Sequence, residues 1–423
     1  MPGRSRSRRL VALAGLLPLV ALACTDDGAS TPTVAPARTT TTTEPPRADD
    51  GVLRIGVLLP ETGSGAGFGA PLIDAVDLAA EQINEAGGVL GRPIELVHAD
   101  EGDTPSAARD AIADLLDEDV DAVVGPASST IALATLSDLL EGGVLTCSPT
   151  ATALALDDFP ERDLFFRTAP SDSLQALAIA DEAERTGALT AAVMYLDDLY
   201  GRPFAEATIA ALEAKGITVE DRIGFAAGDS LVDEATSAAS SGAGVFVVIG
   251  DAEQGVRMLS TLGEVTGVAS RENPPSIIVN DAMRRPASPQ QIAELATDVR
   301  ERIIGLSPSV SSGNSGEPPG AFATNAYDCV NLIALAAARA GSDNPRAIAA
   351  QIASVSRAGV TCHMFAECTA LLEQVPNVDY DGPGGYLELG ADGDPVVYRY
   401  DKWSFDAQGV DYNLTPPILV TRA

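Results

Sequence analysis

Positive charge and histidine are scarce in this sequence of 423 residues. Lysine occurs only at Lys215 and Lys402, and 27 basic residues stand against 60 acidic ones, for a formal net charge of −33. A surface this acidic repels nucleic acid, so we expect no nucleic-acid partner. His98 and His363 are the only histidines, too few for a His-rich metal site or for a hydrolase that pairs several histidines with serine or cysteine. We therefore expect no metal, no cofactor and no catalytic residue.

The N-terminus lacks a hydrophobic run long enough to span a bilayer. The apolar stretch from Leu10 to Ala23 has 14 residues, against the roughly 20 that cross a membrane. It follows a basic stretch that ends at Arg9, as in a secretory signal, and we expect residues 1–23 to be a signal peptide. Residues 24–50 are rich in Thr, Pro, Ala, Asp and Gly with hardly an aliphatic side chain, which predicts a flexible tether.

Cysteine is sparse, and the first of the five has a distinct setting. Cys24 follows Ala21-Leu22-Ala23, and these four residues resemble a bacterial lipoprotein cleavage box, with Ala21 where Leu is usual. The resemblance implies that the Cys24 thiol is acylated and anchors the chain to a membrane. An ordinary signal peptide with an incidental Cys24 is the alternative.

The remaining four cysteines are an even set, which favours disulfides in an exported chain. Cys362 and Cys368 lie six residues apart across a short turn, and we expect them to pair and close a small loop. Cys147 and Cys329 either pair, by elimination, or remain two buried free thiols.

From Val52 onward, short aliphatic strands alternate with amphipathic helices. The expected strands are 53–59, 94–99, 122–125 and 144–147, and the expected helices are 71–85, 106–116 and 129–140. The pattern repeats after residue 170, with strands 191–195, 217–224, 245–249, 276–279 and 303–306 and helices 172–186, 202–214, 231–240 and 253–262. Helices 320–340 and 345–355 and short strands such as 396–400 follow. This order predicts an α/β fold with two doubly wound parallel-sheet lobes.

Several short motifs follow one another in a specific order between residue 52 and the C-terminus. They are Ile55 to Pro60, Thr62-Gly63, Phe68-Gly69, Ala79 to Asn84, Gly87 to Gly91, Asp100 with Asp103, Gly125 to Ser129, Ser148 to Thr152, Leu199 to Gly201, Asn325 to Asp328 and Asp381 to Gly385. Together they resemble the type I periplasmic solute-binding proteins of the leucine/isoleucine/valine-binding group. The resemblance implies a hinge of three crossovers near residues 168, 305 and 380, with lobe I from 51–168 and 305–380 and lobe II from 169–304 and 381–423.

Candidate ligand contacts in the first lobe follow two of the expected strands. Ser128 and Ser129 begin a helix, where free backbone N–H groups and the helix dipole suit a carboxylate; a plain N-cap at Ser128 is the alternative. Thr150 and Thr152 lie at the carboxyl edge of the sheet, where ligands bind in open parallel sheets. The resemblance implies that the Thr150 carbonyl and the Thr152 hydroxyl hold an ammonium group, although threonines that stabilise a turn fit equally.

Four further candidates come from the resemblance. It implies an acid at Asp281 against the ligand ammonium, an aromatic lid at Tyr200 and an aromatic pocket wall at Phe68. Asp251 stands where the family often has a tyrosine, and in a cleft it would favour a second cationic or hydroxylated group on the ligand. An exposed turn is the alternative for Asp281, and core packing is the alternative for both aromatics.

The resulting functional prediction is a monomeric extracytoplasmic lipoprotein of an ABC importer, anchored to the outer face of the cytoplasmic membrane. It would capture an amino acid, such as a branched-chain one, an amide or a urea-like solute, and deliver it to permease subunits without being an enzyme. A sensory module that signals to a receptor is the first alternative. A dinucleotide-dependent enzyme is a remote one, because Gly65-x-Gly67-x-x-Ala70 and Asp100 fit a loose Rossmann fingerprint.

Overall fold

A computed structural model describes residues 49–228, 230–265, 274–284, 289–308 and 321–422, all within the unit Arg47–Ala423. The expected signal peptide, Cys24 and nearly all of the expected tether lie outside the described residues. No helix in the described ranges combines the length and apolar character needed to cross a bilayer.

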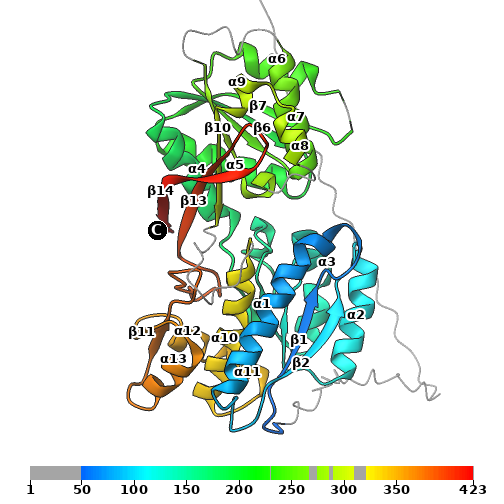
Figure 1. The fold of residues 1–423 in the computed structure, drawn as a ribbon, viewed down its shortest axis with the longest axis vertical. Helices are drawn as coiled ribbons and strands as arrows, with labels where there is room; N and C mark the ends of the chain where they lie inside the picture. The colour runs from blue at the N-terminus through cyan, green and yellow to red at the C-terminus, as the bar shows by residue number, and fades with distance from the viewer. Residues whose placement is uncertain (1–48, 229, 266–273, 285–288, 309–320, 423) are drawn as a thin grey trace, which may run out of the picture. The chain divides into compact units, whose positions relative to one another are not determined.

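The first sheet is fully parallel and has helices on both faces. Its strand order is β2-β1-β3-β4-β5, with β1 (Arg54–Leu59), β2 (Glu95–Asp100), β3 (Ala122–Val124), β4 (Leu145–Ser148) and β5 (Phe165–Arg167). Its main helices are α1 (Ala66–Glu85), α2 (Pro105–Asp117), α3 (Ser129–Glu141) and α10 (Ala323–Ala340). Because successive strand residues point to opposite faces, Val57 packs with α1 and α10, while Leu58 packs with α2 and α3. Figure 1 shows α1 and α10 side by side.

The second sheet is mixed. Its order is β14-β13-β10-β9-β8-β6-β7, with parallel strands β6 (Thr190–Leu196), β7 (Thr218–Phe225), β8 (Val245–Ile249), β9 (Ser276–Val279) and β10 (Ile303–Pro308), followed by antiparallel β13 (Val397–Phe405) and β14 (Asp411–Thr421). Helices α4 (Asp172–Arg185) and α5 (Gly201–Ala214) cover one face, and α6 (Val232–Ser240) and α7 (Ala252–Glu264) cover the other. The short helices α8 (Pro289–Ala293) and α9 (Thr297–Arg300) precede β10.

Residues 345–380 add a small unit beside α10. It consists of α11 (Pro345–Ala349), α12 (Ile352–Val355), β11 (Val360–Cys362), α13 (Phe365–Leu372) and β12 (Val378–Tyr380), with β11 and β12 parallel. Disulfides join Cys362 to Cys368, between β11 and α13, and Cys147 to Cys329, between β4 and α10. The second bridge therefore links the first sheet to α10 through two cysteines that lie 182 residues apart in the sequence.

Three local expectations were wrong. Helix α1 begins at Ala66 rather than at Pro71, which lies inside the helix. The helix can begin early because Gly69 lets it approach the strand that precedes it; a Cβ there would lie 1.8 Å from the Pro60 carbonyl oxygen. Residues 345–355 form two short helices instead of one, a break that nothing in the structure explains.

The C-terminal residues form two long antiparallel strands, not several short ones. Strand β13 pairs with β10, where Gly305 faces Trp403. A Cβ on Gly305 would lie 2.0 Å from the indole ring, so glycine at this position allows the fully buried Trp403 to pack across the strand pair.

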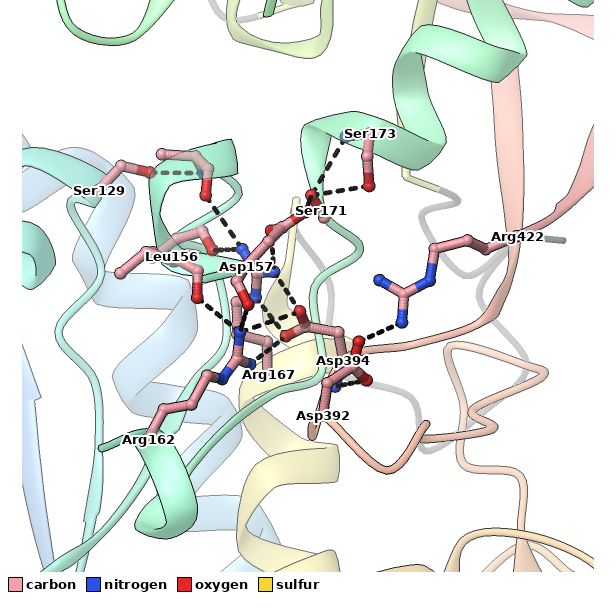
Figure 2. A network of polar contacts seen from close by, with 12 residues as sticks. Ser129, Leu156, Asp157, Arg162, Arg167, Ser171, Ser173, Asp392, Asp394 and Arg422 are labelled. Atoms are coloured by element: carbon pink, nitrogen blue, oxygen red, sulfur yellow. Dashed lines mark hydrogen bonds and ion pairs between the residues drawn. The ribbon is translucent and has the colours of Figure 1, made fainter. Parts of the chain in front are cut away.

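A buried ionic network fixes the chain where β5 leads into α4. Figure 2 shows Arg167 between Asp157 and Asp394. The Arg167 guanidinium lies 2.6 Å from the Asp157 carboxylate and 2.7 Å from that of Asp394, and Arg162 approaches Asp394 to 2.8 Å. Arg167 and Asp394 are fully buried, and the arginines hold the pKa of Asp394 below its usual value despite a burial effect in the opposite direction. Because these charges are buried, removing any one of them would leave a partner charge without compensation and destabilise the fold.

We expect Asp394→Asn to lower the free energy of unfolding by about 3 kcal/mol or more, because it leaves buried guanidinium charge with less compensation. Urea denaturation followed by circular dichroism measures the change. Asp392→Asn is the matched control, since Asp392 pairs with the partly exposed Arg422 and should change stability by less than about 1 kcal/mol. Equal effects of the two substitutions would contradict a special role for the buried network.

Candidate ligand-binding site

The start of α3 is the first part of the candidate site. Ser128 is the N-cap, and its hydroxyl accepts a hydrogen bond from the Ile131 N–H at 3.4 Å. The Ser129 hydroxyl accepts from the Ala153 N–H at 3.3 Å. Both serines are half-buried. The first-turn N–H groups that follow have no partner within the helix, which leaves a seat for an anion.

Glu101 occupies part of the expected carboxylate site at the start of α3. Its carboxylate accepts from the backbone N–H of Ala127 at 2.6 Å and of Ser128 at 2.8 Å. The N–H of Ser128 itself is therefore already used, so an anion would depend on the Ser129 end of the turn and on the hydroxyls. Glu101 is 1% exposed, and burial raises its pKa to about 7 although the two N–H groups act in the opposite direction.

The segment after β4 joins the start of α3 to the start of α4. The Thr150 hydroxyl donates to the Ala127 carbonyl at 2.6 Å, so it stabilises the loop, as the turn alternative expected. The Thr152 carbonyl accepts from the N–H of Asp172 at 2.9 Å. Thr150 and Thr152 are both buried. The three residues from Thr150 to Thr152 thus connect the residue that precedes the N-cap of α3 to the first residue of α4.

Asp172 is a candidate site residue that the sequence pattern did not predict. It is the first residue of α4, after the N-cap Ser171, and it is only 1% exposed. Neither of its carboxylate oxygens has a hydrogen-bond partner in the described part of the chain. Burial and then the charge of Asp281 raise its pKa well above the usual value, and the neighbouring Thr152 hydroxyl and Arg167 do not offset them. Acids are common in the first turn of a helix, so the sequence pattern did not indicate that this one is buried.

Asp281 and Tyr200 lie in the same neighbourhood. Asp281 follows β9, begins a 3-10 turn (Asp281–Arg284) and is 8% exposed, which removes the exposed-turn alternative. Asn280 accepts from the Gly250 N–H at 3.1 Å and donates to the Tyr200 hydroxyl at 3.3 Å. Burial, followed by the charges of Asp172 and Asp281, raises the pKa of Tyr200 well above the usual value.

These contacts define an acidic cluster. It consists of Thr152, Asp172, Tyr200, Asn280 and Asp281, contributed by the segments that follow β4, β6 and β9 and by the start of α4. Its net negative charge and its partly unused polar atoms suit a cation that also donates hydrogen bonds.

Phe68 and Asp251 have structural roles. Phe68, on α1, is half-buried, and its ring lies edge-on to that of Phe322 at 6.5 Å between centroids. Asp251 is exposed and is the N-cap of α7, where one carboxylate oxygen accepts from Glu253 N–H at 2.8 Å and from Gln254 N–H at 2.7 Å. Capping explains an acid at residue 251 without a ligand.

Asp100, the acid of the remote dinucleotide alternative, is engaged in the loop after β1. Its carboxylate accepts from the N–H groups of Glu61, Thr62 and Gly102 and from the Thr62 hydroxyl. Those contacts occupy the oxygens that a ribose would need. Within the described ranges, no group of three or more His, Cys, Asp or Glu is arranged to hold a metal ion.

A surface cavity of about 590 Å³ lies apart from the candidate ligand residues. Ser137, Phe159 and Arg346 are among the residues that line it, and none of the candidate ligand residues does. The acidic cluster and the start of α3 are therefore the candidate site, because the polar groups and the charge are concentrated there.

Comparison with known proteins gives the family. The periplasmic binding protein family model matches residues 52–271. The chain is 30% identical over 364 residues, 81% of this chain and 84% of the relative, to the chemotactic signal transduction system substrate-binding protein BasB of Halobacterium salinarum. It is 28% identical over 70% of this chain and 81% of the relative to a leucine-, isoleucine-, valine-, threonine- and alanine-binding protein of Pseudomonas aeruginosa.

Solved structures agree on the fold. A leucine-binding protein from Thermotoga maritima superposes with a TM-score of 0.67 at 20% identity, covering 88% of this chain and 99% of that one. This chain belongs to the type I periplasmic binding proteins. The predicted family, the two-lobed α/β fold and the assignment as a binding protein and not an enzyme are confirmed.

Glu101 should make stability depend on pH. Its folded-state pKa of about 7 exceeds the ordinary 4.5, so the folded state holds this proton more tightly. The stabilisation is present below pH 4.5 and is lost as pH rises through 7. In Glu101→Gln, the free energy of unfolding should fall less between pH 5 and pH 8 than in wild type, by up to about 3 kcal/mol. Urea denaturation across that range measures it; the exposed Glu118→Gln should follow the wild-type curve, and a Glu101→Gln curve parallel to wild type would refute the assignment.

Proposed function

We propose that this chain is the solute-binding lipoprotein of an ABC importer and that its ligand is a free amino acid. The observation that carries the proposal is the link between the start of α3, which suits a carboxylate, and the acidic cluster, which suits an ammonium group. Three consecutive residues, Thr150 to Thr152, connect them. An α-amino acid carries a carboxylate and an ammonium group on one carbon, so it could occupy both places at once. An amide or urea lacks the positive charge that two buried acids favour.

Each candidate residue then has a role. Ser128 and Ser129 hold the carboxylate through hydroxyl and N–H groups, and the Thr150 carbonyl and Thr152 hydroxyl hold the ammonium together with Asp172 and Asp281. Tyr200 and Phe68 line the side-chain pocket. Asp251, beyond its capping role, lies near a polar substituent if the ligand has one.

Closure of two lobes around the ligand would couple binding to delivery. The proposed lobes are 51–168 with 305–380 and 169–304 with 381–423, and a ligand held from both shifts the population toward the closed state. Permease subunits of the importer would recognise that state. Acylated Cys24 and the tether would hold the monomer at the outer face of the cytoplasmic membrane.

A sensory function is the second candidate. The relative named as a chemotactic signal transduction substrate-binding protein is 30% identical over 81% of this chain. In that case the same closure would present the ligand-bound form to a receptor, with the same site chemistry.

A thermal-shift screen of the purified protein against the twenty L-amino acids, acetamide and urea tests the ligand class. Saturation at 100 times Kd should add about 2.7 kcal/mol of stability. Asp281→Asn should weaken binding of the stabilising amino acid by about 100-fold, because a charge-assisted bond to the ammonium is lost. Asp233→Asn, an acid in the first turn of α6, should bind as wild type does. No shift with any amino acid would rule out the proposed ligand class.

The lipid anchor has a separate test. In a bacterial host, the wild-type chain should be recovered from membranes with a mass that corresponds to acylated Cys24 at the mature N-terminus, whereas Cys24→Ser should be released in soluble form. Mass spectrometry of both fractions measures this. An unmodified Cys24 thiol in membrane-extracted protein would contradict the anchor.

A further inference from the structure

Asp172 is a buried acid that forms no ion pair among the described residues, and the nearby Thr152 hydroxyl favours its charged form without offsetting burial. The residue is 1% exposed, and both carboxylate oxygens lack a hydrogen-bond donor in the part of the chain that the structure describes. An ionised carboxylate in such a place costs several kcal/mol, and a buried group avoids that cost by taking up a proton. The ligand-free site therefore favours a neutral Asp172.

The charges that face Asp172 do not change this conclusion. Asp281 adds negative charge, and the hydroxyls of Tyr200 and Tyr400 are neutral near pH 7, a state that burial favours further by raising the pKa of both. The nearby cation Arg167 is already compensated by Asp157 at 2.6 Å and Asp394 at 2.7 Å.

Arg284, in the same turn as Asp281, is also engaged. It binds Asp411 at 2.8 Å and the Ser307 hydroxyl at 2.8 Å. Arg167 and Arg284 are thus engaged by other groups in the described part of the chain, and a ligand ammonium group would bring further positive charge to Asp172.

We propose that the ligand-free site holds one proton on the Asp172–Asp281 pair and that the ammonium group of the ligand replaces it. The inference rests on the proposed function, since it requires a ligand with an ammonium group. The carboxyl O–H bond breaks, its electron pair stays on the carboxylate, and the proton leaves to water while ligand N–H groups donate to the oxygens. Binding then releases a proton, and affinity rises with pH by up to about tenfold per pH unit.

Glu101 is a further titratable group beside the site, and it acts in the opposite direction. A ligand carboxylate at the start of α3 would favour the protonated form of Glu101, so that Glu101 takes up a proton on binding. The two effects partly cancel in the wild-type protein. Glu101→Gln removes the uptake and keeps an oxygen acceptor for the N–H groups of Ala127 and Ser128.

Isothermal titration calorimetry counts the protons. The probe is the L-amino acid of the screen that stabilises the protein most, titrated at pH 6.5 and 7.5 in buffers with different ionisation enthalpies. The slope of observed against buffer enthalpy gives the protons released. We expect a release approaching one per ligand in Glu101→Gln, and its loss, with pH-independent affinity, in Glu101→Gln combined with Asp172→Asn.

Two further variants complete the test. Asp281→Asn should also lower the release, because it removes the negative charge that adds to burial in holding the proton, and it gives a second test if Asp172→Asn does not fold. Asp328→Asn is the matched control, because Asp328 is another buried acid with a pKa raised by burial to about 7, bonded to Tyr380 and outside the site; it should leave the release unchanged. Binding without release in Glu101→Gln, or release that persists in both site variants, would overturn the inference while leaving the proposed function intact. Absence of binding by every amino acid would overturn both.

Discussion

Burial of Arg167 is the constraint on which the candidate site depends. A guanidinium with no access to water must have its charge and its N–H groups satisfied by protein. Arg167 meets this requirement with two carboxylates and with the carbonyl oxygens of Ala151 and Ala153. The same Asp157 that binds Arg167 accepts from the hydroxyl of Ser171, the N-cap of α4. One buried cation therefore orients both the loop that carries Thr152 and the helix that begins with Asp172.

Buried carboxyl groups are used in two opposite ways in this chain. Asp394 lies against two arginines, which keep its pKa low, and it serves stability. Asp172 and Glu101 form no ion pair among the described residues, and burial raises the pKa of each. Groups of the first kind are fully satisfied by the fold. Groups of the second kind retain polar capacity that a zwitterionic ligand can satisfy, which is why the site is formed from residues that the fold leaves partly unused.

Much of the fold could be predicted from hydrophobic patterning. Strands such as β8 and β9 were placed correctly to the residue, because continuous aliphatic runs between turn residues are characteristic of buried parallel strands. Short elements with weak patterns, such as β5 and the pair β11 and β12, were missed. The early start of α1 also depends on a contact with Pro60 that no periodicity encodes. The serines at α3 and the threonines after β4 became candidates because they follow strands at the carboxyl edge of the sheet.

The sequence by itself determined the alternation of strands and helices, the family and the candidate residues that lie in its motifs, because periodicity and motif spacing are local properties. Only the tertiary structure decided which polar groups are buried and what they contact. In the folded chain the N–H of Ser128 donates to Glu101, Asp251 caps a helix, and Asp172 lies near Asp281. Burial and electrostatic proximity arise from residues far apart in the chain, and the energetics of a charged site depend on both.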